Sequence, residues 1–115
     1  MLYSLITING KDYRCRLSTR NAVELERKMG KNPLNIFMKM ADGNVYPNLD
    51  DMMMIFHASL QKYHHGITLE EAYNIFDEYV DEGHTLIDFI PFILEIFQNS
   101  GFIPKETEED SLPNE

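Results

Sequence analysis

The chain has 115 residues, of which 43% are hydrophobic, and this length suits one small domain with a modest core. Nineteen acidic residues against ten lysines and arginines give a net charge of −9, which disfavours binding to nucleic acids and to anionic membranes. The single cysteine, Cys15, excludes an internal disulfide and is typical of a reducing compartment. The N-terminal MLYSLITING has no basic leader and no apolar run reaches about 18 residues, so we expect a soluble, cytoplasmic protein.

The first predicted element is a β-hairpin centred on Asn9-Gly10. This pair accepts positive φ at both central positions of a type I′ turn, and β-prone residues flank it. Because a two-residue turn fixes the register, Ser4 should lie opposite Cys15, with the Cys15 thiol buried rather than nucleophilic. The predicted core face is made of Leu2, Ser4, Ile6, Tyr13, Cys15 and Leu17. Two strands alone are marginally stable, so the hairpin should pack on helices or pair with another chain.

Two short helices are predicted next. The first follows Ser18-Thr19, either of which can cap it, and ends at Gly30. The second restarts at Asn32-Pro33, with Asn as the cap and Pro as the first helical residue, and ends at Asp42-Gly43. Each carries apolar residues on one side and should dock on the core.

The strongest helical pattern lies in residues 48–68. Asp50 and Asp51 suit its start, and His64 and His65 suit its C-terminal end, because the helix dipole favours these charges there. One apolar stripe should face the core, made of Leu49, Met52, Met53, Phe56, Leu60 and Tyr63. Met54, Ile55 and Ala58 lie on the other side. This helix should therefore touch two neighbours or present a second face to a partner.

Two further helices complete the predicted domain. Thr68 and Glu71 form a capping box for the first, which ends at Gly83. The last runs from Thr85 to Gly101, and Pro91 should bend it slightly or mark a later start. Its apolar arc covers more than half of its circumference, which predicts a helix that is central in the bundle or partly bound to a partner.

These elements predict an α+β fold with an N-terminal β-hairpin packed on a small bundle of four to five α-helices. Residues 1–103 should form this single domain. Residues 104–115 are polar and acidic without any period, and we expect them to be a disordered tail.

No motif indicates catalysis, a cofactor or a metal. The stretch FDEYVDEGHTLIDF resembles a calcium loop, but placing Gly83 at its sixth position puts Phe89 at the twelfth, where an oxygen ligand is required. His57 and His64 lie two turns apart, too far for one ion to bridge without other ligands. We therefore expect a protein that is not an enzyme and that holds no metal.

Methionine is the residue type that points to a partner. Five of the seven methionines lie at positions 38, 40, 52, 53 and 54. Such side chains fill gaps in cores, and they also form surfaces that accept varied apolar partners. Together with the excess apolar area of two helices, the second interpretation predicts a partner-binding surface made of Met54, Ile55, Phe89, Phe92 and Ile96.

Three segments carry a resemblance to a known family. They are YSLITINGKDYRCRLSTRNAVELERKMGKNPL, LQKYHHGITLEEAYNIFDEY and LEIFQNSGFIP, and the resemblance covers roughly residues 3–104. The chain resembles the small tail assembly chaperones of long-tailed phages and prophages of Gram-positive bacteria. The resemblance implies a non-enzymatic protein of the host cytoplasm that coats the helical, aggregation-prone tape measure protein until the tail tube polymerises around it. It marks no binding residues.

The resemblance also implies the partners. Such chaperones are commonly made in two lengths by ribosomal frameshifting, so the expected partners are the tape measure protein and a frameshifted longer form of this chain. A homo-oligomer is a further expectation. The alternative function is a small dimerising adaptor or regulatory protein of a phage or prophage, which would use the apolar arc of the last helix.

Overall fold

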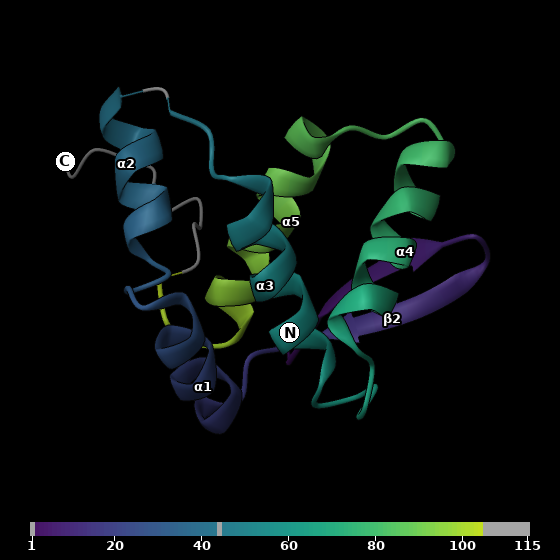
Figure 1. Cartoon of the computed structure of the whole chain (residues 1–115), viewed down its shortest axis with the longest axis horizontal. Coiled ribbons are helices and arrows are strands. Elements are labelled where there is room, and N and C mark those ends of the chain that lie inside the picture. The colour runs from purple at the N-terminus through teal and green to yellow at the C-terminus, as the bar shows by residue number, and fades with distance from the viewer. Residues whose placement is uncertain (1, 44, 105–115) are drawn as a thin grey trace, which may run out of the picture.

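The computed structural model describes residues 2–43 and 45–104, and within them an N-terminal hairpin is followed by five helices (Figure 1). The predicted α+β class is confirmed. The expected acidic tail lies outside the described residues from position 105 on. The elements are β1 (Ser4–Ile8), β2 (Lys11–Cys15), α1 (Thr19–Met29), α2 (Asn35–Gly43), α3 (Leu49–Leu60), α4 (Leu69–Asp81) and α5 (Leu86–Asn99).

The hairpin has the predicted turn and register. Asn9 and Gly10 have φ angles of 54° and 74°, as a type I′ turn requires. Ser4 pairs with Cys15 and Ile6 with Tyr13 in an antiparallel ladder. The predicted face is the core face, since Ser4, Tyr13, Cys15 and Leu17 are buried and Ile6 is half-buried. The exception is Leu2, which precedes β1 and is 69% exposed.

Side-chain caps start three of the helices where the sequence places them. Ser18 is the N-cap of α1 and its side chain accepts a hydrogen bond from the Asn21 N–H. Thr68 and Thr85 begin α4 and α5 with complete capping boxes. Pro91 lies within α5, so it does not mark a later start.

Helix α2 begins later than predicted. The Asn32 side chain accepts from the N–H of Leu34 at 3.0 Å, and the chain makes one tight turn over Pro33 and Leu34 before α2 begins at Asn35. Asn32 therefore caps a turn rather than the helix.

Helix α3 ends at Leu60, earlier than the position of His64 and His65 predicts. The side chain of Gln61 accounts for this end: its Nε2 donates to the carbonyls of His57 and Ile67, and its Oε1 accepts from the Gly66 N–H. These bonds close a compact turn over residues 61–67. His64 and His65 consequently belong to this turn and not to the last turn of the helix.

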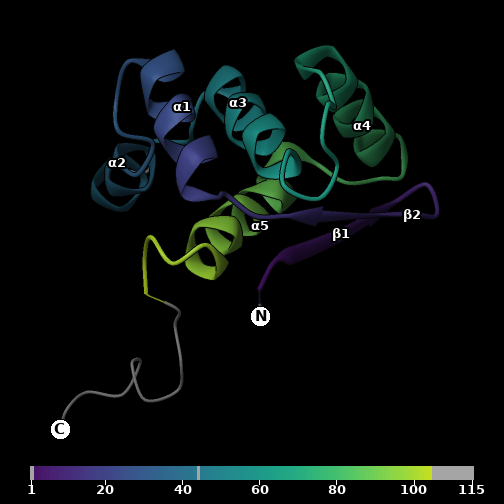
Figure 2. The same ribbon diagram turned by 90° about the horizontal axis from the view of Figure 1, so that it is seen from below.

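The helices form a layer of α1, α3 and α4, with α5 and the hairpin on one side of it (Figure 2). Helix α3 is central, because it contacts α1, α4, α5 and β2. At its start the buried carboxylate of Asp51 pairs with Lys31 at 2.8 Å. Of the two alternatives for α3, contact with several neighbours is therefore the one observed.

Candidate functional site

Three residues of the predicted partner-binding surface belong to the core. Ile55, Phe89 and Ile96 are each 0% exposed, so the prediction that they project outward is wrong. The apolar arc of α5 is wide because this helix packs inside the domain, against α3 and β1. The same argument applies to α3, whose neighbours cover a wider arc than the single stripe predicted from the sequence.

The surroundings of Phe89 show why it is buried. Its ring lies 5.2 Å from that of Phe56, 5.1 Å from that of Phe76 and 5.4 Å from that of Tyr79, measured between centroids. Such edge-to-face and tilted pairs are favourable geometries for aromatic side chains. Phe89 therefore joins α3, α4 and α5 through one aromatic cluster.

Met54 and Phe92 are half-buried and lie in different places. Met54 lines a cavity of about 290 Å³ between α1 and α3, together with polar residues such as Lys28 and His57. Phe92 packs against Phe56, with 6.5 Å between the ring centroids. These two residues do not form the joint apolar surface that the sequence predicts.

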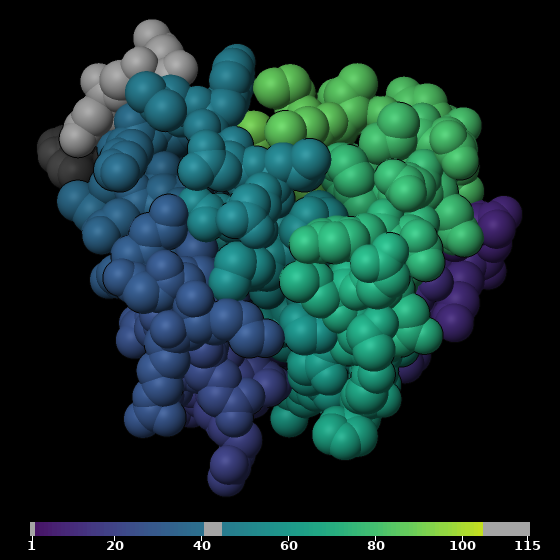
Figure 3. Space-filling view, viewed as in Figure 1, coloured from purple at the N-terminus to yellow at the C-terminus, as the bar shows by residue number. Residues whose placement is uncertain are grey.

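The structure offers another apolar surface, a groove between α3 and α4. It has a volume of about 320 Å³ and is lined by Leu49, Asp50, Met53, Tyr73, Phe76 and Asp77. Met53 is buried, whereas Leu49 is 49% and Tyr73 38% exposed. The space-filling view shows this face, with α3 in teal beside α4 in green (Figure 3). We call these six residues the α3–α4 groove.

The α3–α4 groove combines an apolar lining with negative charge. Asp50 and Asp77 are exposed and none of the lining residues is basic. The whole chain has a net charge of −9, so the field around the groove favours cations. Methionine on a groove wall can adapt its shape to different side chains. The groove can therefore receive an apolar stripe that is flanked by lysine or arginine.

The sequence pattern does not predict this groove. Leu49 and Met53 belong to the apolar stripe predicted for residues 48–68, yet Leu49 is partly accessible. The sequence signal that could have found the groove is the position of the acids: Asp50 follows Leu49 directly, and Asp77 lies one turn after Tyr73.

The other chemically reactive side chains have structural roles. Cys15 is buried, as predicted, and burial raises the pKa of its thiol to about 12. His57 Nε2 lies 2.9 Å from the Ile67 carbonyl, whereas His64 Nε2 accepts the backbone N–H of Arg14 at 3.0 Å. Burial lowers the pKa of both imidazoles, and for His64 the positive charges of Lys11 and Arg14 lower it further.

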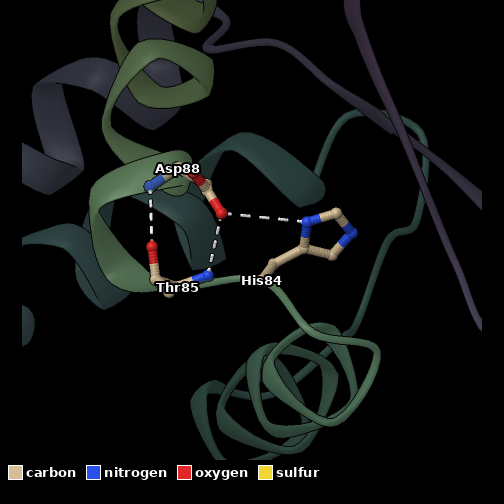
Figure 4. Close-up of polar contacts among 3 residues, drawn as sticks. All are labelled: His84, Thr85 and Asp88. Atoms are coloured by element: carbon tan, nitrogen blue, oxygen red, sulfur yellow. Dashed lines mark hydrogen bonds and ion pairs between the residues drawn. The ribbon is translucent and has the colours of Figure 1, made fainter.

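The stretch that resembles a calcium loop contains the N-terminal capping box of α5. The Thr85 hydroxyl accepts from the Asp88 N–H at 3.2 Å, and the Asp88 carboxylate accepts from the Thr85 N–H at 3.1 Å (Figure 4). The same carboxylate lies 3.9 Å from Nδ1 of His84. Asp88 is therefore engaged in the capping box.

Neither a metal cluster nor a membrane span occurs in the described part of the chain. In residues 2–43 and 45–104, no three His, Cys, Asp or Glu side chains are grouped so that they could hold a metal ion. Among the same residues, no helix has the length and apolar character needed to cross a membrane.

Comparison with known proteins gives a family but no function. No curated protein and no solved structure matches the chain. A family match covers residues 5–114, which is nearly the whole chain. The chain therefore belongs to the Family of unknown function (DUF6096).

Proposed function

We propose that this protein is a tail assembly chaperone of a phage or prophage, which binds the tape measure protein in the host cytoplasm and keeps it soluble during tail assembly. The observation that carries the proposal is the α3–α4 groove, an apolar surface open to solvent on an acidic domain. The resemblance of the sequence to such chaperones supplies the identity of the partner. No reaction is part of the proposal.

The groove suits the segment type that a long helical protein exposes before assembly. An amphipathic helix places apolar residues at positions i, i+3, i+4 and i+7, and such a stripe binds in apolar grooves between helices. Met53 on the floor accommodates varied side chains, and Leu49 and Tyr73 on the walls add apolar contact. Asp50 and Asp77 would pair with basic residues beside the stripe.

Co-expression tests the proposal. The chain and the tape measure protein from the same genome are produced together in bacteria, and the soluble fraction of the tape measure protein is measured with and without the chaperone. We expect the soluble fraction to rise severalfold, with co-purification of both proteins. An unchanged soluble fraction and no complex would contradict the proposal and favour the adaptor function.

A matched pair of variants tests the groove itself. Leu49→Lys with Tyr73→Lys places two cations on the groove walls, and we expect this variant to fold but no longer solubilise the tape measure protein. The control, Val23→Lys with Met38→Lys, changes the charge equally at exposed positions on α1 and α2, outside the groove. If both variants solubilise the partner equally, the groove is not the binding site.

A further inference from the structure

The outer edges of β1 and β2 differ in their hydrogen bonding to the rest of the protein. The outer edge of β2 is hydrogen-bonded to α3 and the turn that follows it: Arg16 donates its N–H to the Ser59 carbonyl at 2.8 Å, and Arg14 donates to His64 at 3.0 Å. These bonds satisfy the outward N–H groups of Arg14 and of Arg16, which directly follows β2. They also show that, in β2, the backbone groups pointing away from β1 belong to the even-numbered residues.

The outer edge of β1 has no such cover. Because Ile8 and Lys11 flank the two-residue turn, Ser4, Ile6 and Ile8 direct their backbone groups toward β2. The N–H and C=O groups of Leu5 and Thr7 consequently point away from β2. Within residues 2–43 and 45–104, no hydrogen bond is found for these four groups.

The uncovered edge has defined ends. At one end, Nδ2 of Asn99 donates to the Tyr3 carbonyl at 3.3 Å, and at the other Asn9 donates its N–H to the carboxylate of Glu82. The opening therefore runs from Leu5 to Thr7, with Ile6 at its centre. In Figure 2, β1 lies below β2, and no helix of the described residues is drawn beyond it on the side away from β2.

The sequence of β1 lacks the features that protect a free edge. Residues 3–8, YSLITI, contain no charge and no proline, although the whole chain carries a net charge of −9. Natural proteins usually protect an edge strand with lysine, proline or a bulge, because a free edge pairs with another strand. Leu5 is 46% exposed, and Ile6 is half-buried although Ser4 and Ile8 on the same face are fully buried. The apolar side chains that are not fully covered and the backbone groups without hydrogen bonds thus lie in the same part of β1.

We propose that β1 pairs antiparallel with β1 of a second copy of this chain, across a two-fold axis at Ile6. In this register Leu5 lies opposite Thr7 of the second copy, and Thr7 lies opposite its Leu5. The four free groups of each strand then form four hydrogen bonds, and the two Ile6 side chains cover each other on the core face. The result is a four-stranded sheet with the order β2-β1-β1-β2.

The observations favour a second copy over a strand of another protein. The free groups are arranged symmetrically about Ile6, so the edge is complementary to itself. Two uncharged strands also meet without bringing like charges together, which a chain of net charge −9 otherwise risks. The proposed dimer does not depend on the proposed function, because the α3–α4 groove lies on other elements.

Sedimentation equilibrium with charge variants tests the dimer and its register. The intact chain should sediment with twice its 13.5 kDa mass. Leu5→Lys with Thr7→Lys puts lysines opposite each other twice across the axis and should raise the dimer dissociation constant about tenfold. Leu5→Glu with Thr7→Lys puts opposite charges there and should restore the dimer. Within its own hairpin, the variant Leu5→Glu with Thr7→Lys also has opposite charges at the paired positions, since residue 5 pairs with Arg14 and residue 7 with Asp12.

Two further variants show whether dissociation is caused by the edge of β1 itself. Val23→Lys with Met38→Lys has the same charge change as the double lysine variant and should remain dimeric. Should the double lysine variant unfold in circular dichroism, Leu5→Pro replaces it, since proline there removes an N–H that points away from β2, and it should be monomeric. A monomeric intact chain, or a dimer that is insensitive to every edge variant, would overturn the proposal. So would dissociation of the control variant.

Discussion

The two ends of α3 differ in how their apolar side chains are covered. In the middle and at the end of the helix, Phe56 and Leu60 are buried and Phe56 packs against Phe89 of α5. In the first turn, Leu49 is half-exposed on the α3–α4 groove. These residues belong to one stripe with helical spacing, yet only part of the stripe is core. An apolar stripe thus shows which side of a helix faces the protein, and the neighbouring helices decide how far along it the cover extends.

The largest effect on stability is expected where α5 covers the apolar stripe of α3. Phe89→Ala would leave a cavity among the rings of Phe56, Phe76 and Tyr79, and it should cost about 3–5 kcal/mol in the free energy of unfolding. The measurement is urea denaturation followed by circular dichroism. Ile87→Ala in the same helix is the control, because Ile87 is exposed and its truncation should change stability by about 0.5 kcal/mol or less. Equal effects of the two variants would show that Phe89 does not lie in the core.

For a second pair of variants, both in α3, the structure predicts the opposite order of stability losses from the sequence pattern. Ile55→Ala should cost about 2–5 kcal/mol because Ile55 is fully buried, whereas Leu49→Ala should cost less than about 1 kcal/mol. Both variants are compared with the intact chain in the same denaturation experiment. If Leu49→Ala is the more destabilising, the stripe assignment from the sequence is right and the groove is closed in solution.

Local chemistry explains which features of the fold could be predicted. The Asn9-Gly10 turn fixed the hairpin register, and the boxes of Thr68 with Glu71 and Thr85 with Asp88 fixed two helix starts, because each depends on residues at most three apart. The end of α3 was misplaced because the hydrogen bonds of Gln61 to residues 57, 66 and 67 leave no periodic signal.

The candidate site was harder to predict because exposure depends on several elements at once. The sequence pattern places Ile55 on the side of its helix opposite the apolar stripe, and only the packing of α3 and α5 within the domain places Ile55 and Ile96 inside. The groove needs α3 and α4 side by side, which no property of either segment specifies. Residue types such as Met53 and Asp77 were visible in the sequence, but their proximity was not.

The smallest expected effect concerns His64, which ties the hairpin to the turn after the covered end of α3. Its Nε2 accepts the Arg14 N–H, and a protonated imidazole cannot accept this bond. Burial, followed by the charges of Lys11 and Arg14, lowers the pKa of His64 in the folded protein below its usual value of about 6.5. Below about pH 6.5 the unfolded chain therefore binds the proton more readily than the folded protein does. The stabilising contribution of neutral His64 is complete above that pH and is lost as the pH falls toward the lowered pKa, where the loss levels off.

Urea denaturation at a series of pH values between about 7.5 and 5 measures this contribution. His64→Gln keeps a neutral acceptor near Arg14 but cannot be protonated, so this variant should lose less stability on acidification than the intact chain. His57 also has a lowered pKa and should account for part of the loss that remains. His65→Gln is the control, since His65 is exposed and adjacent in the chain. A pH dependence that is identical in the His64→Gln variant and the intact chain would mean that the Arg14 bond does not couple the hairpin to α3 through the charge state of His64.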